Sequence, residues 1–340
     1  MRVLVTGVSH ALGGALARRL EANPDIDAVF GLDIDDPRVA LDRTEFVHAD
    51  TRHSLLTKVV RGLEVDAVVH CAVLTESRTS ARTLHETNVI GTMNLLAACS
   101  GSGSPVRRVV VKSSIAVYGC QPYAPSYVGE SYDAAVSEPL GRELQEMEQM
   151  VREFALRNRG TATTLFRLGH RLGRGEPTPL GAYFRLRQVP SFLGFDPRIQ
   201  LLHEEDAVEA LYRATVADHG GVYNVAGPGV LLLSRAIRLA GREKCSVLPP
   251  YVRSIARAGL RLRGFDMPAY LADFLCYGCV VDADALEHEF GWRPVHSTRE
   301  TLLDFVESGG VEAHPALGPQ EYELSAYLQR RRRRGLRAPA

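Results

Sequence analysis

The chain has 340 residues, of which 45% are apolar and 24% charged, values that suit a soluble globular protein with one large α/β domain, alone or with a smaller second one. Forty basic residues balance forty acidic ones, which argues against a general polyanion binder and predicts no nucleic-acid partner. No apolar run reaches the about 20 residues of a membrane span. The N-terminus resembles a strand more than a signal peptide, so we expect a cytoplasmic protein without membrane contact.

The first residues predict a strand followed by a phosphate-binding turn. The run MRVLVTG is β-branched and apolar and ends in Gly7, and the helix after it carries Gly13 and Gly14 near its start. A tight glycine turn at a helix N-terminus binds a pyrophosphate, because backbone amides and the helix dipole both face the anion. The residues predicted to form this cofactor turn are Gly7, Ser9, His10, Ala11 and Leu12.

A second predicted strand, AVFGLDID, ends in Asp33 and Ile34, about 20 residues beyond the turn. An acidic residue at this place accepts hydrogen bonds from the hydroxyls of an adenosine ribose and repels a 2′-phosphate. Asp33 therefore favours NADH, although His10 or Arg38 can offset it for NADPH, and the sequence leaves both cofactors open. The alternative role for Asp33 is that of a simple strand-end cap.

The chain continues as alternating strands and helices. Strands are predicted at residues 45–50, 65–73 and 106–114, and a helix at 85–99. This alternation predicts an α/β fold with a doubly wound parallel sheet of the Rossmann type. Right-handed crossovers place the carboxyl ends of all its strands on one ligand-binding edge.

In order and spacing, several segments resemble the extended short-chain dehydrogenase/reductase family over nearly the whole chain. They are TGVSHALGG at 6–14, SSIAVYG at 113–119, FRLGHRLGR at 166–174 and VDADALEHEFGWRP at 281–294. The resemblance implies a bound NAD(P)H, with Asp33 on the adenosine ribose and Asp50 and Thr51 beside the adenine. It places the following residues around the remainder of the cofactor: Cys71, Ala72, Val73, Asn88 and Leu168.

The resemblance also implies a catalytic set that is incomplete here. Ser114 matches the family residue that hydrogen-bonds the reacting carbonyl, and Glu148 matches a glutamate four residues beyond the lysine of a Y-x-x-x-K motif. This register puts Leu140 at the tyrosine position and Leu144 at the lysine position. A shifted motif is excluded, because no lysine lies between Lys112 and Lys244.

Other departures bear on the substrate. Ile115 and Ala116 stand where a sugar-nucleotide dehydratase has Asp-Glu, and His170 replaces a common asparagine, so neither a dehydratase nor a sugar-nucleotide substrate is favoured. Leucines at the base of a cleft leave polar hydroxyls unpaired, so we expect a flat, apolar, aromatic substrate. The residues predicted to contact the substrate are Thr75, Leu140, Leu144 and His170.

These features predict an NAD(P)H-dependent ketoreductase without the usual acid, similar to the atypical family members that act on angucyclinone-type aromatic polyketides in antibiotic biosynthesis. The proton would come from water, from a phenol of the substrate, or from Tyr123, Tyr127 or Tyr132. Two alternatives stay open, an inactive NAD(P)-binding sensor or scaffold and, last, a sugar-nucleotide epimerase.

The domain prediction assigns residues 1–172 and 198–226, with a strand near 202, to the cofactor domain. Residues 173–197 and 227–320 form a substrate region with a lid, and residues 321–340 form a basic tail that includes the solvated run 330–334. The pair CYGC at 276–279 is predicted to be a buried strand rather than a metal site, because zinc needs about four ligands. The protein is expected to be a monomer or a homodimer.

Overall fold

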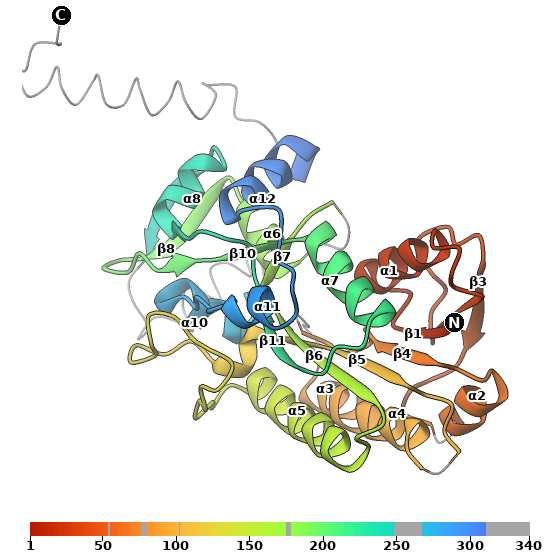
Figure 1. Ribbon diagram of the computed structural model, residues 1–340. Coiled ribbons are helices and arrows are strands. Elements are labelled where there is room, and N and C mark those ends of the chain that lie inside the picture. Colours follow the sequence, from red (N-terminus) through yellow and green to blue (C-terminus); the bar gives the residue numbers. More distant parts are fainter. Residues whose placement is uncertain (54, 76–79, 102, 175–177, 248–266, 311–340) are drawn as a thin grey trace, which may run out of the picture.

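A parallel sheet of seven strands forms the centre of the protein (Figure 1). The computed structural model describes residues 1–53, 55–75, 80–101, 103–174, 178–247 and 267–310. The sheet has the order β11-β6-β5-β4-β1-β2-β3, and every neighbouring pair is parallel. The predicted doubly wound α/β fold is therefore confirmed. The strands are β1 (Arg2–Thr6), β2 (Ala28–Asp33), β3 (Thr44–His48), β4 (Ala67–His70), β5 (Arg108–Ser114), β6 (Ala162–Leu168) and β11 (Gly221–Val225).

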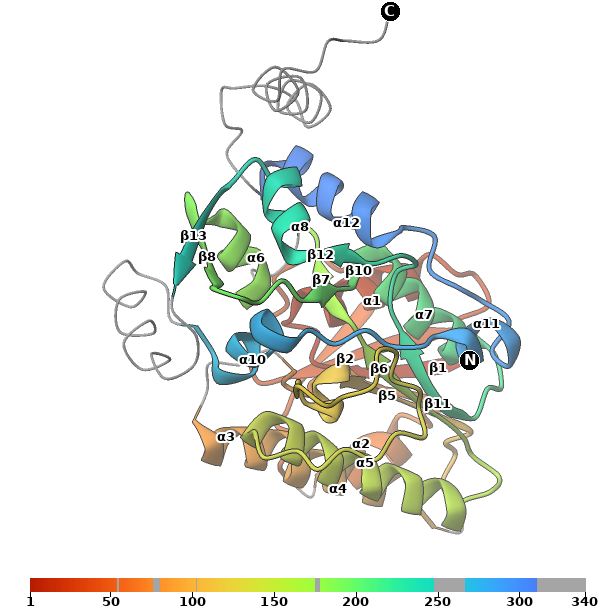
Figure 2. The ribbon, with the colours of Figure 1, turned by 90° about the vertical axis from the view of Figure 1, so that its left-hand side faces the viewer.

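Helices cover both faces of this sheet (Figures 1 and 2). One face carries α1 (Ala11–Glu21) and α7 (Glu204–Val216), and the other carries α2 (Leu56–Gly62), α4 (Gly91–Cys99) and α5 (Pro139–Arg157). The short α3 (Ala81–His85) runs through a π-helical turn, η1 (Glu86–Ile90), into α4. Successive side chains of a strand point to opposite faces, so Val109 and Val111 of β5 pack in the core under α5, while Val110 packs in the core under α1 and α7.

The remaining elements form a second region beyond the carboxyl ends of β5 and β6 (Figure 2). Three short strand pairs build it, namely β7 (His170–Leu172) with β10 (Leu201–His203), β8 (Gln188–Phe192) with β13 (Glu243–Val247), and β9 (Arg198–Ile199) with β12 (Leu231–Leu232). Its helices are α6 (Pro179–Arg185), α8 (Leu233–Leu239), α10 (Ala269–Tyr277) and α12 (Thr298–Phe305), and a π turn, η4 (Val306–Gly310), follows. The short α11 (Asp284–His288) instead packs against β11 of the large sheet.

Two local predictions about this second region are corrected. The strand near residue 202, β10, pairs with β7 outside the large sheet, and the late strand that joins the large sheet is β11. The CYGC segment is not a strand, because Cys276 lies in the last turn of α10 and Gly278 ends that helix with a left-handed φ of 72°. Part of the expected lid, residues 175–177, and the whole expected tail lie outside the described residues.

Helix α5 is fixed to the sheet by a buried ion pair. The carboxylate of Glu148 accepts hydrogen bonds from Ser113 Oγ at 2.6 Å and from Arg167 Nη2 at 2.6 Å, which ties the helix to β5 and β6. Arg167 also donates to the Tyr118 hydroxyl at 2.6 Å, and that hydroxyl donates to Asn224 of β11 at 2.7 Å. Glu148 is fully buried, so a shift of α5 along the sheet would leave its carboxylate without partners. The network therefore fixes the position of α5 on the sheet.

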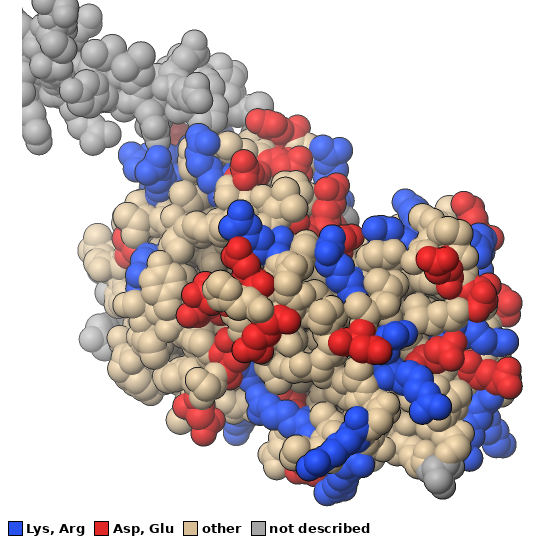
Figure 3. Space-filling view, in the orientation of Figure 1, with Lys and Arg blue, Asp and Glu red and all other residues tan. Residues whose placement is uncertain are grey.

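The surface carries charges of both signs. On the face seen in Figure 3, acidic and basic side chains are interspersed over the central sheet and its helices. Within the described part of the chain, no helix combines the length and apolar character needed to span a membrane.

Candidate functional site

The turn between β1 and α1 forms a tight backbone cradle. Gly7 has a φ of 78°, and a Cβ there would lie 2.6 Å from the backbone nitrogen of Ala72, which follows β4. A Cβ on Gly13 would lie 2.2 Å from the Gly7 oxygen, so the helix can start this close to the strand only with glycine. In this described stretch no side chain caps the start of α1 and its first turn holds no acidic residue, so its positive end stays available to an anion.

Asp33 ends β2 beside this cradle. Its Oδ2 accepts from the Ser9 hydroxyl at 2.6 Å and from the Ser9 amide at 3.0 Å, and its Oδ1 accepts from the Ile34 amide at 2.8 Å. These bonds hold the carboxylate rigidly against the turn, and Ile34 stands next to it with 48% of its surface exposed. The predicted ribose residue and the predicted phosphate turn are thus brought together.

The other predicted cofactor residues lie along the same edge. Asp50 follows β3 and is paired with Arg52, which lowers the pKa of its carboxyl through a side-chain hydrogen bond. Thr51 is buried next to it. Cys71 and Val73 are buried after β4, and Leu168 is buried at the end of β6.

Asn88 holds the chain after β4 in place. Its amide nitrogen donates to the Leu74 carbonyl at 2.9 Å, and its amide oxygen accepts from the Leu74 amide at 2.7 Å. This two-point contact fixes residue 74 and thereby sets the position of Thr75, which is buried. Residues 76–79 lie outside the described chain.

Ser114 stands at the carboxyl end of β5, where the strand turns into the 3-10 helix η2 (Ile115–Tyr118). Its Oγ accepts from the Ala116 amide at 3.2 Å, which orients the side chain and leaves its own hydroxyl proton to donate elsewhere. Immediately beyond it, Ile115 and Ala116 line a cavity of about 20 Å³. The predicted carbonyl-binding serine therefore directly precedes two residues of the cavity wall, and its contact with substrate stays a prediction.

His170 forms an aromatic wall of that cavity with Tyr270. The imidazole is stacked on the Tyr270 ring at 6.4 Å between centroids and lies 4.0 Å from the Phe274 ring centroid. Burial lowers the pKa of His170 to about 4, so this histidine is neutral at pH 7. The wall is therefore flat and uncharged.

Leu140 and Leu144 belong to the main hydrophobic core. Their exposed fractions are 4% and 0%, and neither contributes to the lining of the cavity described above. A contact of either leucine with substrate stays a prediction.

The structure adds residues that the sequence reasoning missed. Glu138, Tyr270 and Asp273 line the cavity, whereas the four tyrosines of residues 118–132 do not. Tyr123 and Tyr127 are exposed to solvent by 75% and 58%. A signal that could have drawn attention to Glu138 is its place just before Pro139, since acidic residues favour helix N-caps.

Two thiols, Cys120 and Cys279, also line the cavity and are unbridged. A hydrogen bond with Cys279 and burial both hold the pKa of the Cys120 thiol well above its ordinary range. A protonated thiol is a poor nucleophile. Cys120 therefore contributes bulk and polarizability to the wall rather than thiolate chemistry.

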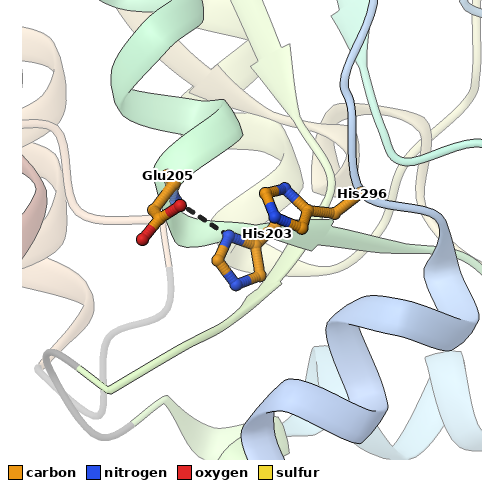
Figure 4. Close-up of side chains that lie close together, drawn as sticks. All are labelled: His203, Glu205 and His296. Carbon is orange, nitrogen blue, oxygen red and sulfur yellow. Dashed lines mark hydrogen bonds between the residues drawn. The ribbon is translucent and has the colours of Figure 1, made fainter.

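His203, Glu205 and His296 lie side by side where α7 begins (Figure 4), with potential ligand atoms within 4.8 Å of one another. Their bonds serve the fold, however. His203 Nδ1 accepts from the Glu205 amide at 3.2 Å, and the opposite nitrogen of that ring contacts Asp304 at 3.3 Å. His296 contacts Asp206 at 3.0 Å and stacks on His203. The cluster caps α7 and ties it to α12 and to the segment that precedes α12.

Comparison with known proteins identifies the family. Residues 3–226 match the model of the NAD dependent epimerase/dehydratase family. The chain belongs to this family. An uncharacterized protein of Mycobacterium tuberculosis strain H37Rv is 37% identical over 319 residues, which cover 91% of this chain and 84% of that protein. An uncharacterized protein of Mycobacterium bovis matches to the same extent.

Solved structures of sugar-nucleotide enzymes share the fold. A UDP-glucose 4-epimerase from Thermotoga maritima has a TM-score of 0.71 at 19% identity, covering 90% of this chain and 98% of the epimerase. A dTDP-glucose 4,6-dehydratase from Bacillus anthracis, in complex with NAD, has a TM-score of 0.68 at 17% identity, covering 90% and 96%. At these identities the likeness establishes the fold and not the substrate.

The geometry of the β1–α1 turn fits the NAD dependence of the family. The glycine cradle, the uncapped start of α1 and the rigid carboxylate of Asp33 offer a pyrophosphate and a ribose the groups they require. The residues present therefore fit a dinucleotide, and the family is one of oxidoreductase-type enzymes.

Proposed function

We propose that this protein is an NAD(P)H-dependent ketoreductase that reduces a carbonyl of an aromatic, angucyclinone-type polyketide in antibiotic biosynthesis. The observation that supports the proposal is that Ser114, at the carboxyl end of β5, directly precedes Ile115 and Ala116, which line a cavity together with the stacked rings of His170 and Tyr270. Flat rings of this kind can stack on an aromatic substrate.

Ser114 has a defined part in this reaction. When bound, the nicotinamide supplies a hydride to the carbonyl carbon, and negative charge develops on the carbonyl oxygen. The hydroxyl of Ser114 donates a hydrogen bond to that oxygen, since the bond from the Ala116 amide orients its Oγ and does not use its proton. The buried, preoriented hydroxyl favours the transition state over the neutral ketone.

The cofactor preference belongs to the same proposal. The rigid carboxylate beside the turn favours the free 2′-hydroxyl of NADH, whereas Arg38, which lies beyond β2, could pair with the 2′-phosphate of NADPH. Replacing Asp33 by Asn, with binding of both cofactors measured by calorimetry, tests this preference. We expect the affinity for NADH to fall relative to that for NADPH.

A second function, a cofactor-binding sensor or scaffold, is favoured by the size of the cavity. A volume of about 20 Å³ holds about one water molecule, so a polyketide enters only if the walls move apart. The third candidate, a sugar-nucleotide epimerase, has the least support, since Leu140 offers no base at the position inferred for the family tyrosine.

One assay separates these functions. The protein is incubated with NADH or NADPH and a panel of aromatic polyketide ketones, and cofactor oxidation and alcohol formation are followed. We expect turnover, and we expect Ser114→Ala to lower kcat by at least roughly tenfold with cofactor affinity unchanged. Tight cofactor binding without turnover of any ketone would support the sensor instead.

A further inference from the structure

The cavity beside Ser114 is bordered by two carboxyl groups. Glu138 reaches it from the start of α5, and Asp273 reaches it from α10. Both side chains are partly buried. Burial penalises the charged form of a carboxyl group, so carboxyl groups at a cavity are candidates for a functional role.

The backbone fixes Glu138 near the turn that holds Ser114. Glu138 is the N-cap of α5, and its Oε2 accepts from the Gly141 amide at 3.1 Å. A Cβ on Gly141 would lie 2.8 Å from the Ala116 carbonyl oxygen, so glycine lets the first turn of α5 approach the 3-10 turn after β5. The carboxyl of Glu138 therefore shares one cavity wall with Ile115 and Ala116.

The surroundings of Glu138 favour its protonated form. Burial is the largest influence and raises the pKa of this carboxyl, and the nearby Asp273 raises it further by charge repulsion. The Gly141 and Leu140 amides and the Arg142 guanidinium oppose the rise but do not cancel it. The other titratable groups of the cavity are His170, Tyr270, Cys120 and Cys279.

We propose that Glu138 is the general acid of the ketone reduction, an inference that rests on the proposed function. As hydride reaches the carbonyl carbon, the C=O π bond breaks toward oxygen, and the carboxyl O–H of Glu138 transfers its proton to that oxygen. The products are the alcohol, the oxidised cofactor and the Glu138 carboxylate, which takes a proton back from solvent. Asp273 acts as a positioning residue that keeps the proton on Glu138 between turnovers.

This assignment explains how the reaction proceeds without a tyrosine. Glu138 lies two residues before Leu140, the position inferred for the family acid, and so it reaches the substrate cavity from the same end of the same helix. Burial and a like charge raise the pKa of this carboxyl group, which makes it a better match for a proton donor than an exposed carboxylate.

The test uses Glu138→Gln, which keeps an oxygen to cap α5 but has no acidic proton. We expect kcat to fall by about a hundredfold or more, within the range of general acid catalysis, while the affinity for cofactor and the KM for the ketone change by less than about threefold. Glu146→Gln is the matched control, since Glu146 is an exposed residue of the same helix and should leave kcat unchanged. Tyr270→Phe removes the competing hydroxyl of the cavity but keeps its ring, so it separates the contribution of the phenol from that of the carboxyl group.

A second readout does not depend on turnover. The infrared band of a protonated carboxyl group is followed against pH in the free protein. We expect a titrating band that is lost in Glu138→Gln and whose midpoint shifts to lower pH in Asp273→Asn. In the kinetic profile, activity should fall as pH rises through the same midpoint.

The outcomes are distinguishable. If the unaltered protein reduces ketones and Glu138→Gln retains kcat within threefold, the general acid is another group and the proposal for Glu138 is wrong. A loss of kcat in Tyr270→Phe but not in Glu138→Gln transfers the role to the phenol. If the unaltered protein reduces no ketone of the panel, the proposed function fails, and the assignment of a general acid fails with it.

Discussion

The cofactor turn and the first turn of α5 lie at the same edge of the sheet but are built differently. The turn after β1 works through its backbone, with a left-handed Gly7 and a helix start free of capping side chains. The start of α5 works through individual side chains, with Leu140 and Leu144 buried and Glu138 at the cavity. A binding site made of backbone geometry changes little when side chains change, whereas an acid–base site can be rebuilt by a few substitutions.

The largest expected effect concerns the anchor of α5. Glu148→Gln leaves Arg167 as a buried charge without its partner, so we expect a loss of about 3–5 kcal/mol in the free energy of unfolding, measured by urea denaturation. Glu153→Gln on the same helix removes a largely exposed pair with Arg157, and we expect less than about 1 kcal/mol.

The Glu148–Arg167 ion pair lies outside both the cofactor turn and the cavity, so its loss should affect stability without affecting cofactor binding. Below the unfolding transition, cofactor affinity should be the same in Glu148→Gln as in the unaltered protein. Equal losses of stability in Glu148→Gln and Glu153→Gln would mean that the buried Glu148–Arg167 pair does not fix the position of α5 on the sheet. The assignment of Leu140 and Leu144 to the tyrosine and lysine positions of the family motif would then lose its main support.

Much of this architecture follows from the sequence, for reasons that differ between the two regions. The phosphate turn, Asp33 and the parallel strands are local patterns, because apolar strands, glycine turns and helix starts follow one another directly along the chain. The cavity is not local. Glu138, His170 and Asp273 are separated by more than 30 residues at each step along the chain, and only the tertiary fold brings the start of α5, the start of β7 and α10 to one cavity.

The same distinction explains the corrected elements. CYGC at 276–279 is a short apolar run whose periodicity cannot separate a strand from the end of a helix, and the helix is defined by residues that precede it, from Ala269 onward. The strand near 202 has the right composition for the large sheet. Its partner is set by the bend after Leu168, which sends β7 away from β6 and lets β10 pair with it.

The next prediction concerns the close backbone contacts of the cofactor turn. Gly7→Ala and Gly229→Ala both place alanine at a left-handed position, with φ of 78° and 79°, which costs about 1–2 kcal/mol in each case. Only at Gly7 does the new Cβ meet neighbouring backbone, whereas Gly229 has open space around it. We expect Gly7→Ala to weaken cofactor binding by more than about tenfold in calorimetry, because the cradle must open to admit the methyl group.

Gly229→Ala controls for the shared strain. It should lower the melting temperature modestly and leave cofactor affinity unchanged. Equal affinities in both variants would show that the turn does not grip the dinucleotide through close backbone contact, and the contrast with α5 would disappear.

The smallest expected effect belongs to the aromatic wall and depends on pH. Burial lowers the folded-state pKa of His170 to about 4, below the unfolded value of about 6.5, so the unfolded chain binds more protons between these values. Stability contributed by His170 is therefore complete above pH 6.5 and declines as pH falls toward 4. The buried His70, whose pKa is lowered to about 3, adds a decline of the same sign.

His170→Phe isolates the contribution of the wall, because phenylalanine keeps the stack with Tyr270 and Phe274 but cannot take up a proton. Between pH 7 and pH 5 we expect the unaltered protein to lose on the order of 1–2 kcal/mol more unfolding free energy than the variant, by urea denaturation at each pH. Cofactor affinity over the same interval should change equally in both proteins, since the wall lies on the substrate side. Identical pH slopes of stability would mean that His170 takes up a proton in the folded protein. Protonation in the folded state requires a wall that opens readily to water. A wall that opens in this way would also let a large substrate into the cavity.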